Sequence, residues 1–93
     1  MRYDMNVRLR LDDTYNFSIS QEIDSDGSSY KHLVEVALFC GDQFVPCNVW
    51  ATNWVGVDYD DDVIRKLDAV DVLEALCYAK NYVYIEAWDG EVL

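Results

Sequence analysis

Apolar and polar residues alternate with a period of two through the first part of the chain. The alternation over residues 5–11 is typical of a strand with one buried face. It stops at the turn-prone residues 12–14 and returns over residues 15–20. The sequence therefore predicts an antiparallel hairpin at the start of the fold.

Two further strands are predicted before residue 55. Residues 30–40 are rich in β-branched and aromatic side chains, and Gly41-Asp42 is a hairpin turn signal. A fourth strand is expected over residues 43–54, at a sheet edge or with a bulge at Pro46, because proline donates no backbone hydrogen bond. The first four strands then form an antiparallel meander.

Residues 60–80 have a helical rather than an alternating pattern. The acidic residues 60–62 fit the positive end of a helix and predict a short helix or turn over residues 61–67. One amphipathic stripe cannot continue from there, because Glu74 would fall within the apolar face. A break capped by Asp68 and a second helix over residues 69–79 remove this conflict. The expected buried face of the second helix comprises Ala69, Val70, Leu73, Leu76 and Cys77.

Alternation returns over residues 82–88, which predicts a last strand before the Asp89-Gly90 turn. The core side of this strand would comprise Val83, Ile85 and Ala87. The opposite side would be an aromatic and acidic row made of Tyr82, Tyr84, Glu86 and Trp88.

The predicted fold is a single acidic α+β domain spanning residues 1–93. It has an antiparallel sheet of about five strands in ββββ-α-β order, with one or two helices packed on one face. Neither a membrane span nor a signal peptide is expected, because no apolar stretch of roughly 18 residues occurs and no apolar run follows the N-terminal charges. We expect a cytoplasmic protein, located in the host cytoplasm if the chain is encoded by a phage.

Charge narrows the choice of partner. Eighteen acidic against seven basic side chains give a formal charge of −11, and residues 11–93 alone carry −13. Such a charge repels nucleic acid and anionic membranes, so direct binding to either is not expected. The expected partners are basic host proteins or nucleic-acid-binding complexes.

The chain offers little material for catalysis or for a cofactor. His32 is the only histidine, and no phosphate-binding loop, nucleophile elbow or metalloprotease motif occurs. The three cysteines have no C-x-x-C spacing and are expected to be reduced, mostly buried thiols. A Cys–His pair stays open, because such pairs form in space rather than in sequence. We expect a protein that is not an enzyme and needs no cofactor.

Two acidic segments raise the alternative of a divalent cation site. Residues 24–28 begin like a calcium loop, but the twelfth position of that loop would be Glu35, inside a predicted strand. A solvated turn is the simpler interpretation. The aspartates at 58 and 60–62 also offer carboxylates, although helix capping already accounts for them. No metal site is therefore assigned, and a small divalent-cation-binding domain remains an alternative.

The concentration of acidic residues in the stretch 58–74 is the feature of the sequence that a role in solubility explains least well. B-DNA presents a negative charge about every 1.7 Å of its axis, and carboxylates at comparable spacing compete for a groove lined with Lys and Arg. Exposed Tyr and Trp would add hydrophobic anchors, whereas Trp50 and Trp54 are expected to be in the core or half-buried. The predicted partner-binding residues are Asp58, Asp60, Asp61, Asp62, Asp71, Glu74, Tyr82, Tyr84, Glu86 and Trp88.

In size, charge and compactness, the chain resembles the small acidic proteins that phages and mobile elements use against host nucleic-acid machinery, such as anti-CRISPR and anti-restriction inhibitors. The resemblance implies a DNA mimic that blocks a basic groove of a host defence complex, and it carries over no functional residue. Alternatives are an immunity protein or antitoxin for a basic nuclease toxin, a cation-binding domain, and an accessory protein that self-associates. A monomer or a homodimer is expected.

Overall fold

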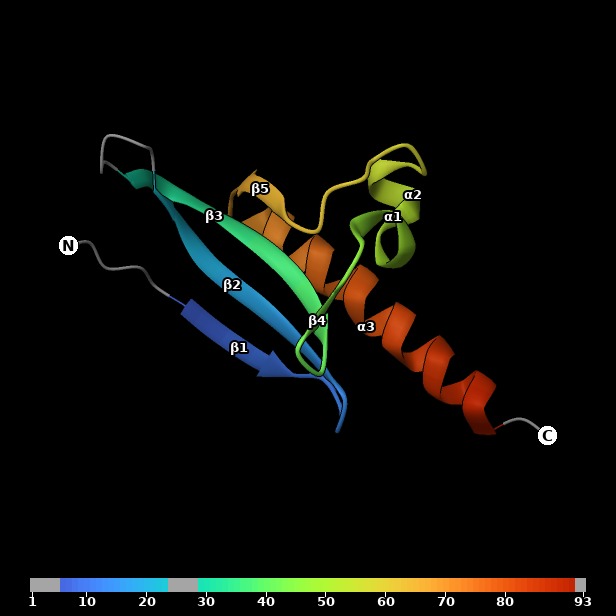
Figure 1. Ribbon diagram of the computed structural model, residues 1–93. Coiled ribbons are helices and arrows are strands. Elements are labelled where there is room, and N and C mark those ends of the chain that lie inside the picture. The colour runs from blue at the N-terminus through green and yellow to red at the C-terminus, as the bar shows by residue number, and fades with distance from the viewer. Residues whose placement is uncertain (1–5, 24–28, 92–93) are drawn as a thin grey trace.

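The computed structural model describes the backbone of residues 6–23 and 29–91 and the side chains of residues 6–21 and 34–86. Within these residues, five strands and three helices follow one another (Figure 1). They are β1 (Asn6–Arg10), β2 (Tyr15–Ile23), β3 (Ser29–Cys40), β4 (Gln43–Val45), α1 (Cys47–Trp50), α2 (Thr52–Val55), β5 (Ile64–Leu67) and α3 (Ala69–Glu91). The calcium-like turn at 24–28 lies outside the described residues, as do the side chains of His32, Ala87 and Trp88.

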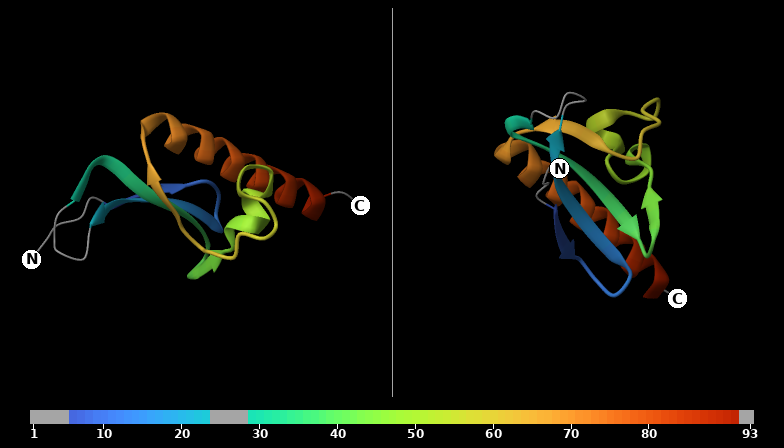
Figure 2. Two further views of the ribbon diagram at one scale, coloured as in Figure 1. Left: turned by 90° about the horizontal axis from the view of Figure 1, so that it is seen from above. Right: turned by 60° about the vertical axis from the view of Figure 1, so that its left-hand side comes forward.

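The sheet is antiparallel at every described strand pair and has the order β1-β2-β3-β4. β3 is central: one edge pairs with β2, and the other is shared by β4 at residues 38–40 and β5 at residues 34–36. α3 crosses one face of the sheet, with α1 and α2 beside it (Figure 2). The predicted α+β class is confirmed. The predicted order of four strands, helix and strand is also confirmed, and α3 follows the last strand.

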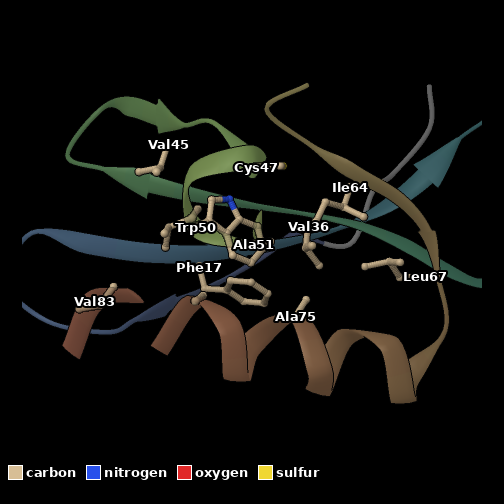
Figure 3. Packing of buried hydrophobic residues seen from close by; sticks show 12 residues of the cluster. Phe17, Val36, Val45, Cys47, Trp50, Ala51, Ile64, Leu67, Ala75 and Val83 are labelled. Atoms are coloured by element: carbon tan, nitrogen blue, oxygen red, sulfur yellow. The ribbon is translucent and has the colours of Figure 1, made fainter. Parts of the chain in front are cut away.

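The core lies between the sheet and the helices. Phe17 of β2 and Leu38 of β3 pair across the ladder and have no exposed surface. The Trp50 indole of α1 meets the Phe17 ring edge to face, with centroids 6.0 Å apart. Ala75 and Ala79 of α3 belong to the same buried cluster (Figure 3). Because these two side chains are small, α3 can approach the large side chains of the sheet closely.

The strand predicted over residues 43–54 is wrong beyond Val45. β4 forms three residue pairs with β3, and Pro46 then precedes α1 with a φ of −58°. Proline suits a helix start because its ring fixes φ, and its missing N–H has no partner to lose there. α1 and α2 are short helices on either side of Ala51, which is fully buried. The chain therefore turns onto α3 instead of continuing along the sheet edge.

The short helix or turn predicted over residues 61–67 is wrong, because β5 occupies Ile64–Leu67. Ile64 and Leu67 pair with residues of β3 that are only two apart, so β5 contains a bulge. Lys66, within the bulge, has a φ of 61° in the left-handed region. The extra residue turns Ile64 and Leu67 to the same buried face. The acidic residues 60–62, from which the short helix was predicted, do not begin a helix: the Asp61 carboxylate binds the N–H groups of Asp62 and Val63 and the Arg65 guanidinium.

The helix predicted over residues 69–79 is confirmed from its first residue. Asp68 caps it as expected: its Oδ1 accepts a hydrogen bond from the Asp71 N–H at 2.9 Å. The predicted buried face is largely wrong, because most of it points outward. The exposed members are Ala69, Val70, Leu73 and Cys77, whereas Leu76 is partly buried.

The strand predicted over residues 82–88 is wrong, because α3 continues through it to Glu91, and the Asp89-Gly90 turn is part of the helix. Ala75, Ala79 and Val83 recur every four residues, and all are buried. A helical register therefore keeps burying surface beyond residue 80, and this outweighs the β propensity of the aromatic and β-branched residues there. Ile85, expected in the core, is 47% exposed.

Candidate interaction surface

Residues 56–63 link α2 to β5 and hold four of the predicted partner-binding aspartates. The stretch has no regular secondary structure, yet it is tied to α1 at two points. The Asn48 side-chain amide donates a hydrogen bond to the Val57 carbonyl at 3.1 Å. The Cys47 N–H donates to the Asp61 carbonyl at 3.1 Å. We call residues 56–63 the acidic segment.

Asp61 and Tyr59 stabilise the acidic segment from within. The Asp61 carboxylate accepts hydrogen bonds from the N–H groups of Asp62 at 2.8 Å and Val63 at 3.3 Å, and from the Arg65 guanidinium at 2.7 Å. The hydrogen bond from Arg65 is the main cause that lowers the pKa of Asp61, and the backbone donors add to it. The Tyr59 hydroxyl donates to the Val63 carbonyl at 2.9 Å, and burial raises its pKa. Asp61 is thus a structural residue.

Asp58, Asp60 and Asp62 are the remaining carboxylates of the acidic segment. Asp58 and Asp60 are exposed, and Asp62 is partly exposed. Within the described ranges, none of the three takes part in an ion pair. The segment therefore presents three negative charges from a backbone that its own hydrogen bonds hold in place.

Asp71 and Glu74 extend the acidic surface onto the first turns of α3. Asp71 is partly exposed and Glu74 is exposed. Asp71 also stabilises the helix, because a negative charge in the first turn complements the positive end of the helix dipole. Residues 58–74 together contain seven acidic and two basic side chains.

Helix geometry divides the predicted aromatic and acidic row. Residues two apart in a helix are separated by about 200° around its axis, so Tyr82 and Glu86 share one side of α3, and Tyr84 lies on another. Tyr82 packs against Tyr15 edge to face at 5.9 Å. Tyr84 is 66% exposed, and Glu86 is exposed. The row is therefore wrong as one continuous surface.

Trp50 and Trp54 are part of the fold, as the sequence predicts. Trp50 is buried against Phe17. Trp54 is partly buried and stacks on Tyr78 of α3, with ring centroids 5.8 Å apart. The two indoles join α1 and α2 to the rest of the core.

The outer side of α3 carries Val70, Leu73 and Cys77, which the sequence analysis assigned to the core, and Tyr84, which it assigned to a partner-binding row. Val70 is 71% exposed and Leu73 is 63% exposed, and Cys77 and Tyr84 are exposed on the same side. We call these four residues the outer stripe. Their signal in the sequence is the seven-residue spacing of Val70, Cys77 and Tyr84, which repeats on one side of a helix.

The sheet face opposite α3 presents arginine and aromatic side chains, which the sequence analysis did not bring together. The Arg8 guanidinium of β1 lies 4.2 Å from the centroid of the Phe39 ring, a cation–π contact. Phe39 in turn packs on Phe44 of β4 at 4.5 Å. Ser18 and Ala37, between these side chains in the sheet, are buried. A small cavity of about 160 Å³ lies on this face.

The cysteines are free, as expected, but they differ in burial. Cys47 is buried, Cys40 is partly buried and Cys77 is exposed, so the expectation of mostly buried thiols fails for Cys77. Burial is the main cause that raises the pKa of Cys47 to about 12, and Asp61 and Asp62 add to it. In the part of the chain that the structure describes, no three His, Cys, Asp or Glu side chains form a group suited to a metal ion.

Comparisons with known proteins leave the function to be argued from these surfaces. No protein-family model, curated protein or solved structure matches the chain. Among the described residues, no helix has both the length and the apolar character needed to cross a membrane. The acidic segment, the outer stripe and the arginine-bearing sheet face are the features from which function can be inferred.

Proposed function

We propose that the chain is a non-enzymatic acidic binding protein that docks the acidic segment onto a basic surface of a nucleic-acid-binding protein. Its carboxylates take the place of phosphates, as in a DNA mimic. A phage or mobile-element inhibitor of the anti-CRISPR or anti-restriction type acts in this way on a host defence complex in the host cytoplasm. Asp58, Asp60 and Asp62 supply the first contacts, and Asp71 adds charge from α3.

The observation that carries the proposal is a set of carboxylates fixed on a hydrogen-bonded backbone. Asp61 and Tyr59 hold the acidic segment, while Asp58, Asp60 and Asp62 form no ion pair in the described ranges. A loop that is ordered before binding loses less conformational entropy when it binds. Concentrated negative charge also speeds the encounter with a basic partner. Solubility alone requires neither the fixed backbone nor the local excess of acid.

An immunity protein or antitoxin for a basic nuclease toxin is the alternative that the same surface supports. Both functions need carboxylates that fit a nucleic-acid groove, so the surface does not separate them. The partner does: an immunity protein neutralises the isolated nuclease, whereas a defence inhibitor binds a complex that DNA or RNA also binds. The divalent-cation alternative has less support, because Asp61, in the middle of the cluster, is already bound by Arg65.

A pull-down with a matched pair of variants tests the proposal. The tagged protein is incubated with a bacterial lysate that carries nucleic-acid-targeting defence systems, at about 0.1 M and about 0.5 M salt, a range over which exposed charge pairs become strongly screened. The test variant is D58N/D60N. The control D13N/D42N removes the same charge from exposed turns at one end of the sheet.

We expect capture of a nucleic-acid-binding protein that added DNA or RNA displaces and that higher salt weakens. D58N/D60N should lower the captured amount about tenfold, whereas D13N/D42N should lower it less than about twofold. Equal loss in both variants would reject the acidic segment as the docking site. A partner that is insensitive to salt and to nucleic acid would reject the mimic itself.

A further inference from the structure

We propose that the sheet face opposite α3 binds a small aromatic carboxylate, in the hollow that lies between Arg8 of β1 and Phe44 of β4. The hollow is the cavity of about 160 Å³ on that face. The inference does not depend on the proposed function, because none of the predicted partner-binding carboxylates lines the hollow.

Small residues form the floor of the hollow, and large residues form its walls. Arg8 pairs with Ser18 across β1 and β2, and Ser18 pairs with Ala37 across β2 and β3, so these three side chains share one face of the sheet. Phe39, two residues beyond Ala37, lies on the same face and pairs with Phe44. Ser18 and Ala37 are buried between the larger side chains. The hollow is thus part of the regular sheet and needs no mobile loop to form it.

Ser18 gives the hollow a polar group that the protein itself does not use. Ser18 is only 7% exposed and lines the hollow. Its side-chain hydroxyl takes part in no hydrogen bond within the described ranges. Hydroxyl groups at buried positions normally have a partner, and a hydroxyl can both donate and accept. A polar ligand in the hollow supplies the missing partner.

Arg8 supplies the charge that selects a carboxylate. It is exposed and takes part in no ion pair within the described ranges. The flat face of its guanidinium lies over the Phe39 ring, 4.2 Å from the centroid. Stacking of this kind leaves the N–H groups in the guanidinium plane available, and a carboxylate accepts two of them side by side. The ring contact also positions Arg8 before a ligand arrives, which lowers the entropy cost of binding.

The size and the walls of the hollow indicate an aromatic ring. A cavity of roughly 150 Å³ accommodates a benzene molecule, and the hollow has about this volume. Phe39 and Phe44, with ring centroids 4.5 Å apart, form a wall on which a flat ring can pack. Phe44 is 46% exposed, so a bound ring would cover apolar surface that the protein leaves open.

The remaining charges restrict the ligand to a single negative charge. The chain carries a formal charge of −11, and Glu35, which also lines the hollow, lies 3.8 Å from Arg65 in an ion pair. A doubly charged anion such as phosphate meets stronger repulsion from these acids than a monocarboxylate does. Benzoate combines one carboxylate with one ring and is therefore the probe that the hollow fits.

Titration of the isotope-labelled protein with sodium benzoate, followed by NMR spectra of the backbone amides, tests the site. We expect saturable shifts centred on Ser18, Ala37 and Phe39, with a dissociation constant of about a millimolar for so small a ligand. Benzyl alcohol, which keeps the ring without the charge, should bind about tenfold more weakly. Acetate, which keeps the charge without the ring, and inorganic phosphate should also bind about tenfold more weakly.

Arg8→Gln and Arg10→Gln are a matched pair of variants. Both positions are exposed on the same face of β1, and each substitution removes one positive charge, but Arg10 does not line the hollow. Arg8→Gln should weaken benzoate binding about tenfold or more, whereas Arg10→Gln should weaken it less than about twofold. Equal weakening by both variants would mean a general attraction to the basic strand and would overturn the proposal.

Ser18→Val tests the hollow without a change of charge. Valine suits a strand, fills the floor and removes the hydroxyl, so benzoate binding should be lost. Asn16→Val is the control, because Asn16 is the next residue on the same face of β2 and does not line the hollow. Amide spectra that stay unchanged away from the hollow show that each variant is folded. The proposal is wrong if benzoate shows no saturable binding to the wild type, or if Ser18→Val binds it as tightly as the wild type does.

Discussion

On its inner face, α3 meets the sheet with small residues: Ala75, Ala79 and Val83 are buried. On its outer face, the larger Leu73 and Tyr84 are more than 60% exposed. The residues that face α3 explain the contrast. Phe17 of β2 and Trp50 of α1 are large, and they fill the space in front of the inner face of α3. The space that the neighbouring elements leave thus decides which side chains of this helix are buried. Hydrophobicity alone does not identify the buried face.

The largest expected difference between the outer face and the interior is the reactivity of two thiols. Cys77 lies on the outer stripe, whereas Cys47 is buried. The Cys47 pKa of about 12, against an ordinary value of 9.0, leaves about a thousandfold less thiolate at pH 8, and burial slows access further. Alkylation with iodoacetamide, followed by peptide mass spectrometry, should therefore label Cys77 and leave Cys47 unmodified. Similar rates at both sites would mean that the core opens readily.

The inner face should not accept a larger side chain. Ala79→Leu adds three carbon atoms where α3 contacts the sheet, and overpacking of this kind should lower the free energy of unfolding by about 1–3 kcal/mol. Urea denaturation measures the change. Ala69→Leu, at an exposed position of the same helix, is the matched control and should stay within about 0.5 kcal/mol of the wild type. A neutral Ala79→Leu would show that α3 does not pack as closely as described.

The outer face should tolerate the loss of a large side chain. Leu73→Ala should change the stability of the monomer by no more than about 0.5 kcal/mol, because the side chain is mostly exposed. Urea denaturation at low protein concentration measures this. A loss of about 2 kcal/mol at low concentration would instead show that Leu73 belongs to the core.

The parts of the fold that the sequence predicts are those where a local pattern and the tertiary structure agree. The alternation over residues 15–20 sets the faces of β2, and Asp68 caps α3 through a residue three positions away. The failures depend on contacts distant in sequence. The period of residues 82–88 favours a strand, yet burial of Val83 against the sheet decides for helix. The bulge at Lys66 is set by pairing with β3, which no local pattern records.

In the candidate site, too, the sequence predicts some properties and misses those that depend on the folded structure. The sequence identifies the acidic residues of the stretch 58–74, because charge is a property of composition. The sequence does not separate Asp61, which is bound by Arg65, from Asp58 and Asp60. That distinction requires the path of the backbone around Val63. Val70, Leu73 and Cys77 of the outer stripe were assigned to the core for a related reason. A helical wheel shows which residues share a side, and only the packed structure shows which side is covered.

The edge of the sheet formed by β1 affects how the protein behaves at high concentration. β1 pairs with β2 on one side, and no strand of the described part pairs with its other side. An unpaired edge is a template on which a strand of another molecule can add, the first step towards fibrous aggregates. Arg8 and Arg10 belong to this edge strand and are exposed; Arg10 forms an ion pair with Asp13, whereas the Arg8 guanidinium lies over the Phe39 ring and takes part in no ion pair within the described ranges. Two such edges brought together would place the Arg8 residues of the two molecules near each other, and this contact between like charges opposes pairing of one edge with another.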